Sequence, residues 1–163
     1  MTITIRRFKK DDIEDAKNLM IELCEITGAE FNEERWLWGI KMRLYDALKR
    51  NGMLIASDDG KIAGLLLADI NIDPTGVSTG YIRSVIVGAS YRKKGIGKQL
   101  VSEAINYLKN MDVDTILINV RGTTEHAMKL YENLGFRELY RVMEYPLPKK
   151  KIENMKLPDS YNP

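Results

Sequence analysis

A turn that combines two glycines with four basic side chains interrupts the apolar pattern in the middle of the chain. It comprises Arg92, Lys93, Lys94, Gly95, Ile96, Gly97 and Lys98. Glycines lack a Cβ and let the backbone approach a ligand closely, and the first N–H groups of a helix have no partner within the helix. Because a helix N-terminus with nearby cations is suited to bind an anion, the turn is a candidate phosphate-binding site.

Two phosphate-binding motifs do not fit this turn. A dinucleotide fingerprint needs a third glycine where the chain has Leu100, and an acidic residue after the next strand, where it has Val120 and Arg121. A Walker loop needs glycine at position 92, which is arginine, and a hydroxyl at position 99, which is glutamine. From these residues alone, the turn is either an anion site of another kind or a tight strand-to-helix connection.

The apolar periodicity around the turn predicts one α/β domain with a mixed sheet. Strands are expected at residues 2–7, 53–57, 61–70, 79–87, 115–120 and 138–145, and helices at 13–28, 32–50, 96–110 and 125–133. The turn Asp58-Asp59-Gly60 predicts a hairpin, and the helix at 96–110 predicts a right-handed crossover between two parallel strands. Residues 1–146 form the expected domain, and residues 147–163 a basic, proline-containing tail that packs weakly.

The composition is that of an ordinary soluble globular protein. Of the 163 residues, 44% are hydrophobic and 29% are charged, and the net charge of +2 is too small to indicate a nucleic-acid partner. Cys24 is the only cysteine, which excludes an internal disulfide and disfavours a cysteine-based metal site. Neither an apolar signal region nor a run of membrane-spanning length is visible, so we expect a cytoplasmic protein that binds neither membrane nor metal.

Two motifs give the chain a family resemblance. Residues 85–97 read VIVGASYRKKGIG, and residues 126–136 read HAMKLYENLGF. In this order and spacing they resemble the GCN5-related N-acetyltransferases, the GNAT superfamily, over residues 2–145. The resemblance implies acetyl-CoA as the donor of an acetyl group. It also implies a mixed, mostly antiparallel sheet with about four helices, in which a central pair of parallel strands is splayed to admit acetyl-CoA.

The resemblance further implies which residues hold acetyl-CoA. The backbone N–H groups of residues 92–98 would bind its pyrophosphate, and the backbone of Val85, Ile86 and Val87 would pair with its pantetheine arm. The N–H of Val87 would polarise the thioester carbonyl as an oxyanion-hole donor. Thr124 stands where the family often has an asparagine near the CoA arm.

Other residues would handle the protons of the transfer. Tyr131 matches the general acid of the family, which protonates the departing thiolate; its alternative role is to pack a helix onto the sheet. Tyr81 occupies the place of the glutamate base of many relatives. Some N-terminal acetyltransferases of the family use a tyrosine there and a histidine on the next strand, acting through ordered water. Here that second position is Asn119, which can position the water but cannot act as a base.

Two further residues have reactive side chains but are not expected to react. His126 starts the last helix, where a histidine is usually solvated, and Cys24 is expected in the core or in a groove wall. Direct transfer of the acetyl group, without an acyl-enzyme intermediate, is therefore favoured.

The favoured acceptor is the α-amine of a peptide or protein N-terminus. Its pKa of about 8, against about 10.4 for lysine, leaves more of it unprotonated at neutral pH, which suits a site without a carboxylate base. A polyamine or other small amine is the alternative, because Glu30, Glu33 and Glu34 would attract it if they faced the groove. A CoA-binding module without catalysis is another alternative. The sequence is compatible with a monomer or a homodimer.

Overall fold

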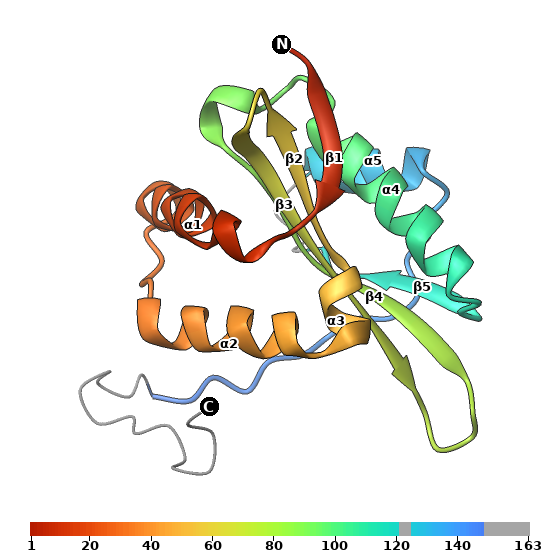
Figure 1. The fold of residues 1–163 in the computed structure, drawn as a ribbon. Helices are drawn as coiled ribbons and strands as arrows, with labels where there is room; N and C mark the ends of the chain where they lie inside the picture. The colour runs from red at the N-terminus through yellow and green to blue at the C-terminus, as the bar shows by residue number, and fades with distance from the viewer. Residues whose placement is uncertain (121–124, 149–163) are drawn as a thin grey trace.

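The computed structural model describes residues 1–120 and 125–148, which form a five-stranded sheet with helices on both faces (Figure 1). The strands are β1 (Ile3–Arg7), β2 (Met53–Asp58), β3 (Lys61–Ile72), β4 (Ser78–Val87) and β5 (Thr115–Ile118), and their order in the sheet follows the sequence. Neighbouring strands are antiparallel, except that β4 and β5 are parallel. The predicted mixed, mostly antiparallel sheet is confirmed.

Two helical layers cover the sheet. The helices α1 (Ile13–Thr27) and α2 (Glu33–Tyr45) lie on one face, α4 (Ile96–Asn110) and α5 (Glu125–Asn133) lie on the other, and the short α3 (Ala47–Asn51) leads into β2 (Figure 1). Side chains alternate along each strand, so each face has its own core. Leu66 and Ala68 of β3 pack with α4, whereas Leu65 and Leu67 pack with α1 and α2. No helix in residues 1–120 and 125–148 is long and apolar enough to span a membrane.

The hairpin between β2 and β3 forms as predicted. Asp59 and Gly60 make a two-residue turn with φ angles of 48° and 86°. Positive φ at both positions is typical of the type I′ turn, whose twist matches that of the flanking strands. β3 then continues to Ile72, two residues beyond its predicted end.

The single helix predicted at residues 32–50 is wrong, because the segment forms α2 and α3 with a break at Asp46. Asp46 has an extended backbone, with ψ of 116°, and its side chain accepts hydrogen bonds from the N–H groups of Leu48 and Lys49 at 3.0 and 3.2 Å. Aspartate is a favoured residue immediately before a helix, where its carboxylate replaces the missing acceptors of the first N–H groups. Asp46 therefore starts a new helix instead of continuing the first.

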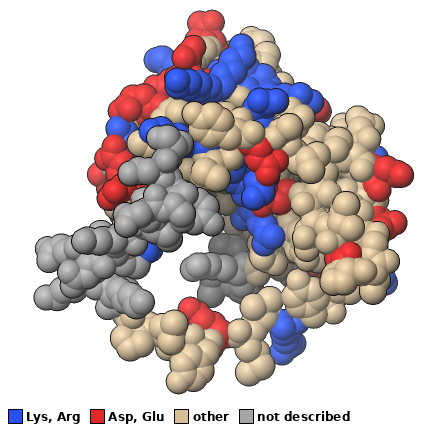
Figure 2. Space-filling model, turned by 60° about the horizontal axis from the view of Figure 1, so that its bottom comes forward, with Lys and Arg blue, Asp and Glu red and all other residues tan. Residues whose placement is uncertain are grey.

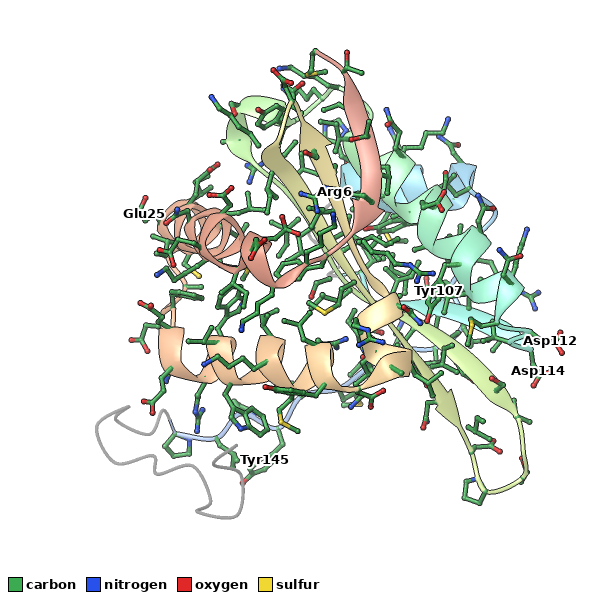
Figure 3. All side chains as sticks on the ribbon, viewed as in Figure 1. Arg6, Glu25, Tyr107, Asp112, Asp114 and Tyr145 are labelled. Atoms are coloured by element: carbon green, nitrogen blue, oxygen red, sulfur yellow. The ribbon has the colours of Figure 1, made fainter. Side chains whose placement is uncertain are left out.

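The strand predicted at residues 138–145 is also wrong: in the described part of the chain, no strand follows β5. Its apolar side chains are exposed, and Tyr145 lies outside the body of the domain (Figure 3). The apolar residues Leu139, Tyr140, Val142 and Met143 suggest a strand from local pattern alone. A strand also needs a neighbouring strand for its backbone hydrogen bonds, and no strand of the described sheet pairs with this segment.

A buried carboxylate joins the end of β1 to the start of α1. Asp12 accepts hydrogen bonds from Arg6 Nη1 and Nη2, both at 2.8 Å, and from the N–H of Lys9 at 2.6 Å; Figure 3 shows Arg6 at this junction. Burial by itself raises the pKa of Asp12, but the hydrogen bonds from Arg6 and Lys9 outweigh burial and hold the pKa below its ordinary value of 3.8.

We expect Asp12→Asn to lower the free energy of unfolding at neutral pH by about 2 kcal/mol, because Arg6 loses its carboxylate partner. The lowered pKa of Asp12 means that its contribution is complete above the unfolded pKa and is lost as the pH falls through the folded pKa. Urea unfolding should therefore show the difference between wild type and variant shrinking below about pH 4. The neighbouring exposed Asp11 supplies the control, Asp11→Asn, and equal losses in the two variants would contradict this account.

Candidate active site

The parallel pairing of β4 and β5 ends before β4 does, because β5 stops at Ile118. Their pairing starts at Thr79 opposite Thr115 and stops at Ile82 opposite Ile118, whereas β4 continues to Val87. Residues 83–87 therefore have β3 on one side and, in the described part of the chain, no strand on the other. We call this opening the β4–β5 wedge. A stretch of β4 that extends beyond its parallel partner is compatible with the splayed pair that the resemblance implies.

Alternate backbone groups of β4 are directed into the wedge. The N–H of Gly88 donates to the carbonyl of Ala63 on β3 at 3.0 Å. Since the direction of backbone groups alternates along an antiparallel ladder, those of Ile86 also point toward β3, whereas those of Val85 and Val87 point into the wedge. Of the three residues expected to bind an extended ligand through their backbone, two thus have N–H groups on the open side, although the carbonyl of Val87 already accepts a hydrogen bond from Arg92 Nε.

The glycine turn follows β4 after one turn of 3-10 helix, η2 (Ala89–Tyr91), and leads into α4. Lys93 and Gly95 have φ angles of 60° and 77°, in the left-handed region that glycine adopts most readily. The first bond of the α4 ladder runs from the N–H of Gln99 to the carbonyl of Gly95 at 3.1 Å. The N–H groups of Gly95, Ile96, Gly97 and Lys98 donate to no acceptor within residues 1–120 and 125–148. They are available to an anion.

Gly97 lies between the end of β4 and α5, and the space beside it is open. A Cβ added there would meet Leu130 Cδ2 and Val87 Cγ2, each at 3.9 Å, which is an ordinary van der Waals contact. The glycine is therefore not required by the packing of the described residues.

The basic side chains of the turn are exposed, and two of them also hold the loop together. Arg92 Nε donates to the carbonyl of Val87 at 3.1 Å, and Lys94 Nζ donates to the carbonyl of Ser90 at 2.8 Å. The other two lysines of the turn make no hydrogen bond or ion pair to any described residue. Their charges add to the positive end of the α4 dipole.

Tyr131 lies on α5, on the same face of the sheet as α4. Its half-buried ring packs with Val85 and Val87 against the core and meets Phe136 edge-on, with ring centres 6.0 Å apart. Burial raises the pKa of Tyr131 above its ordinary value of 10.0, so the hydroxyl is protonated at neutral pH. The hydroxyl has no hydrogen-bond partner among the described residues. Its proton is available to a bound molecule.

Tyr81 lies on the opposite face, which α2 covers, because its neighbour Ile82 packs with α4. Tyr81 is paired with Asp69 on β3 and with Leu117 on β5. Asn119 follows the end of β5 and is exposed. Asn119 thus lies two residues after the partner of Tyr81, and its role beside Tyr81 stays a prediction.

A charged cluster beside Tyr81 is absent from the sequence-based predictions. Asp69 accepts hydrogen bonds from Arg43 Nη1 and Nη2 of α2, at 2.6 and 2.9 Å, and from Arg83 Nε of β4, at 3.3 Å. The guanidinium carbon of Arg83 lies 4.4 Å from the centre of the Tyr81 ring. The only sequence signal is that Asp69 stands where the alternation of β3 predicts an apolar side chain facing the helices.

The remaining candidates contribute less to this site. Thr124 lies outside the described residues, so its contact with CoA stays a prediction. His126 is exposed in the first turn of α5, and Cys24 is half-buried on α1. Within the described residues, no group of three or more His, Cys, Asp or Glu side chains could hold a metal ion.

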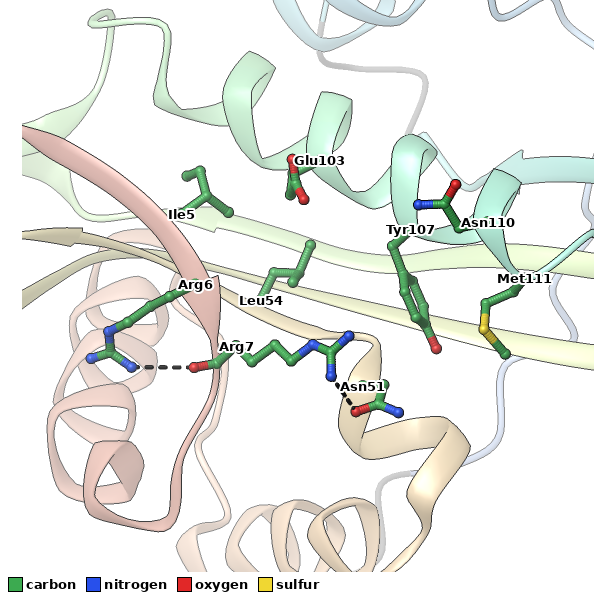
Figure 4. Close-up of a pocket in the computed structure, with 9 residues that line it drawn as sticks. All are labelled: Ile5, Arg6, Arg7, Asn51, Leu54, Glu103, Tyr107, Asn110 and Met111. Carbon is green, nitrogen blue, oxygen red and sulfur yellow. Dashed lines mark hydrogen bonds between the residues drawn. The ribbon is translucent and has the colours of Figure 1, made fainter.

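A pocket of about 310 Å³ lies at the other edge of the sheet, between β1 and α4 (Figure 4). Arg7 Nη1 donates to Asn51 Oδ1 at 2.8 Å on one wall, and the hydroxyl of Tyr107 donates to the carbonyl of Leu48 at 3.1 Å. None of the candidate site residues lines this pocket.

Comparisons with known proteins agree with this geometry. The model of the Acetyltransferase (GNAT) family matches residues 19–136. An uncharacterized N-acetyltransferase of Bacillus subtilis is 33% identical over 122 residues, which are 74% of this chain and 76% of that protein. N-alpha-acetyltransferase 30 of Xenopus laevis is 36% identical over 84 residues, which are 52% of this chain; the match spans only 31% of that relative.

A solved structure shows the same fold. The aminoglycoside N-acetyltransferase AAC(6')-Iy in complex with CoA aligns with a TM-score of 0.75 and 21% identity, over 90% of this chain and 95% of that one. The family model covers more than half of the chain and includes both the β4–β5 wedge and Tyr131. The chain therefore belongs to the GNAT family of acetyltransferases.

Proposed function

We propose that the protein is an N-acetyltransferase that uses acetyl-CoA. The observation that carries this proposal is the succession of the β4–β5 wedge and the glycine turn: the N–H groups of Val85 and Val87 face the wedge, and the N–H groups of residues 95–98, which have no partner among the described residues, follow at the start of α4. An extended arm that ends in a diphosphate fits both parts, because a strand edge binds an extended chain and a helix N-terminus binds phosphate. Acetyl-CoA supplies a thioester that an amine can attack.

In this proposal the backbone of β4 both binds and activates the donor. Val85 and Val87 pair with the pantetheine arm, and the N–H of Val87 donates to the thioester oxygen, where negative charge develops during attack. Ile86 supports them from the other face, where its side chain packs against the core. The lysines of the turn and the first N–H groups of α4 neutralise the diphosphate.

Protons are handled on the two faces of the sheet. Tyr131 donates its proton to the thiolate of CoA, because burial keeps its hydroxyl protonated at neutral pH. Tyr81 and Asn119 hold a water molecule that takes the proton from the attacking amine. Asp69, the nearest carboxylate on β3, is already paired with Arg43 and is not the base.

A peptide or protein N-terminus is the proposed acceptor. An α-amine needs only a weak base, which suits Tyr81 and Asn119, and the partial match to N-alpha-acetyltransferase 30 supports the same choice. The argument for a polyamine is weaker than the sequence suggested, because Glu33 is paired with Lys17 Nζ at 3.2 Å instead of standing free.

The acceptor panel that tests this proposal contains short peptides with free and acetylated N-termini, spermidine and free lysine. With acetyl-CoA as donor, we expect turnover of free-N-terminus peptides and none of the blocked peptides, measured as release of CoA thiol. Because a smaller fraction of a lysine ε-amine is unprotonated at pH 7, blocked peptides that contain lysine should also be poor substrates.

The panel also separates the alternatives. Rapid turnover of spermidine with none of any free-N-terminus peptide would replace the peptide acceptor by a polyamine. Tight binding of CoA without turnover of any amine would leave a CoA-binding module.

A further inference from the structure

Arg83 is the extra residue of a β-bulge in β4 and is placed beside the proposed acceptor position. The register with β3 shifts at this point, so that Leu67 faces Ser84 while Ala68 faces Ile82, and Arg83 has no opposite partner. A bulge redirects the side chain that it carries. Arg83 consequently turns toward the α2 side of the sheet, where its guanidinium lies over the ring of Tyr81.

Asp69 does not neutralise Arg83, because Arg43 already occupies both of its oxygens. The two bonds from Arg43 measure 2.6 and 2.9 Å, and both side chains are largely buried, at 18% exposure for Arg43 and 15% for Asp69. Arg83 adds only a longer bond of 3.3 Å through Nε. Two guanidinium groups thus share one carboxylate, which leaves one positive charge in excess within the cluster.

The free part of Arg83 has the geometry of a carboxylate-binding group. Its side chain is 45% exposed, and its two terminal nitrogens make no hydrogen bond to any residue in the described part of the chain. Asp69 binds the Nε edge and Tyr81 supports the flat face, so the guanidinium is held in place while its two terminal nitrogens keep their donors for another group. Such a fork binds a carboxylate through two parallel hydrogen bonds.

We propose that Arg83 binds a carboxylate of the acceptor, so that the protein prefers amines with an acidic group a few bonds away, in particular peptides with Asp or Glu as the first or second residue. This inference rests on the proposed function, because Tyr81 marks the acceptor amine. It also predicts that a polycation is a poor acceptor, since the excess charge of the cluster repels it. Acidic and basic side chains adjoin one another near the middle of this side of the molecule (Figure 2).

The test compares kcat/KM for peptides that differ only in the first or second residue, with Glu, Gln or Lys at that place. In wild type we expect Glu to exceed Gln by about tenfold and Lys to rank last, since a hydrogen-bonded charge pair at a partly exposed site has about this effect. The preference should weaken in high salt. Arg83→Gln should bring Glu and Gln to parity. Arg83→Lys should keep part of the preference, because it keeps the charge but not the fork.

Arg50→Gln is the matched control, because it removes the same charge from an exposed position on α3 outside this cluster. Melting temperatures of all variants show whether the fold is kept; Arg83→Gln leaves the Arg43–Asp69 pair in place. Free glutamate and free glutamine are tested as acceptors in a separate series. Their α-carboxylates reveal whether Arg83 binds that group as well as a side-chain carboxylate.

Two measurements distinguish failure of this inference from failure of the proposed function. Turnover of peptides with equal kcat/KM for Glu and Gln in wild type would overturn the role of Arg83 alone. If no peptide is acetylated, the role of Arg83 is tested by calorimetry instead, which measures binding of the Glu and Gln peptides in the presence of CoA. A preference for Glu that Arg83→Gln removes would then support the carboxylate site without the reaction, and equal or absent binding would reject it.

Discussion

Gly97→Glu is expected to abolish binding of CoA while leaving the fold intact. A Cβ at this position meets only ordinary contacts, at 3.9 Å from Leu130 and Val87, and lies between the end of β4 and α5. In the proposed complex that space holds the arm and the diphosphate of CoA. A glutamate there both fills the space and repels the diphosphate, with a combined cost of about 3 kcal/mol or more, or at least about 10²-fold in Kd.

Stability should not fall in this variant, because glutamate in the first turn of a helix interacts favourably with the helix dipole. Gly97→Gln has nearly the same size without the charge and should bind CoA with intermediate affinity, which separates repulsion from steric blockade. Gly95 is a poorer choice, since its φ of 77° makes any side chain strained whether or not CoA binds there.

Calorimetric titration of CoA into the folded variants measures the effect, and melting temperature confirms the fold. If Gly97→Glu is folded and binds CoA with the wild-type Kd, the diphosphate does not lie on the glycine turn. The assignment of the β4–β5 wedge would then lose its main support.

The features that sequence predicts well are those with local causes. The hairpin follows from two residues that tolerate positive φ, and the end of α1 follows from Gly28, whose φ is 69°. The α4 helix and its glycine turn follow from an apolar period of 3.6 next to a strand pattern. Each of these signals lies within a few residues of the feature that it predicts.

The features that the sequence does not predict depend on a choice between two local structures of similar pattern, or on contacts between distant residues. Asp46 is compatible with a helix interior by periodicity, and only its hydrogen bonds to the next turn reveal that it starts α3. The cluster of Arg43, Asp69 and Arg83 joins residues up to 40 positions apart, and a one-residue bulge in β4 decides that Arg83 belongs to it. No local pattern in the sequence contains this information.

Tyr131→Phe is expected to lower kcat by about 10²-fold or more, with little change in KM for acetyl-CoA, because the lost hydroxyl acts mainly in the transition state. Phenylalanine keeps the ring that packs against Phe136, so the fold should be unaffected. Steady-state kinetics with the best peptide acceptor gives both constants. Tyr107→Phe is the matched control, because burial likewise raises the pKa of Tyr107, but its hydroxyl bonds to Leu48 near the other edge of the sheet.

The pH profile gives a second readout of the same role. Transfer requires an unprotonated amine and a protonated Tyr131, so kcat/KM should rise through the pKa of the acceptor, about 8 for an α-amine. It should fall only above the pKa of Tyr131, which burial raises beyond its ordinary value of 10.0. The phenylalanine variant should lack that fall, since it has no proton to lose at this position. Equal kcat in wild type and Tyr131→Phe, with superimposable pH profiles, would reduce Tyr131 to a packing residue and would require another proton donor for the thiolate.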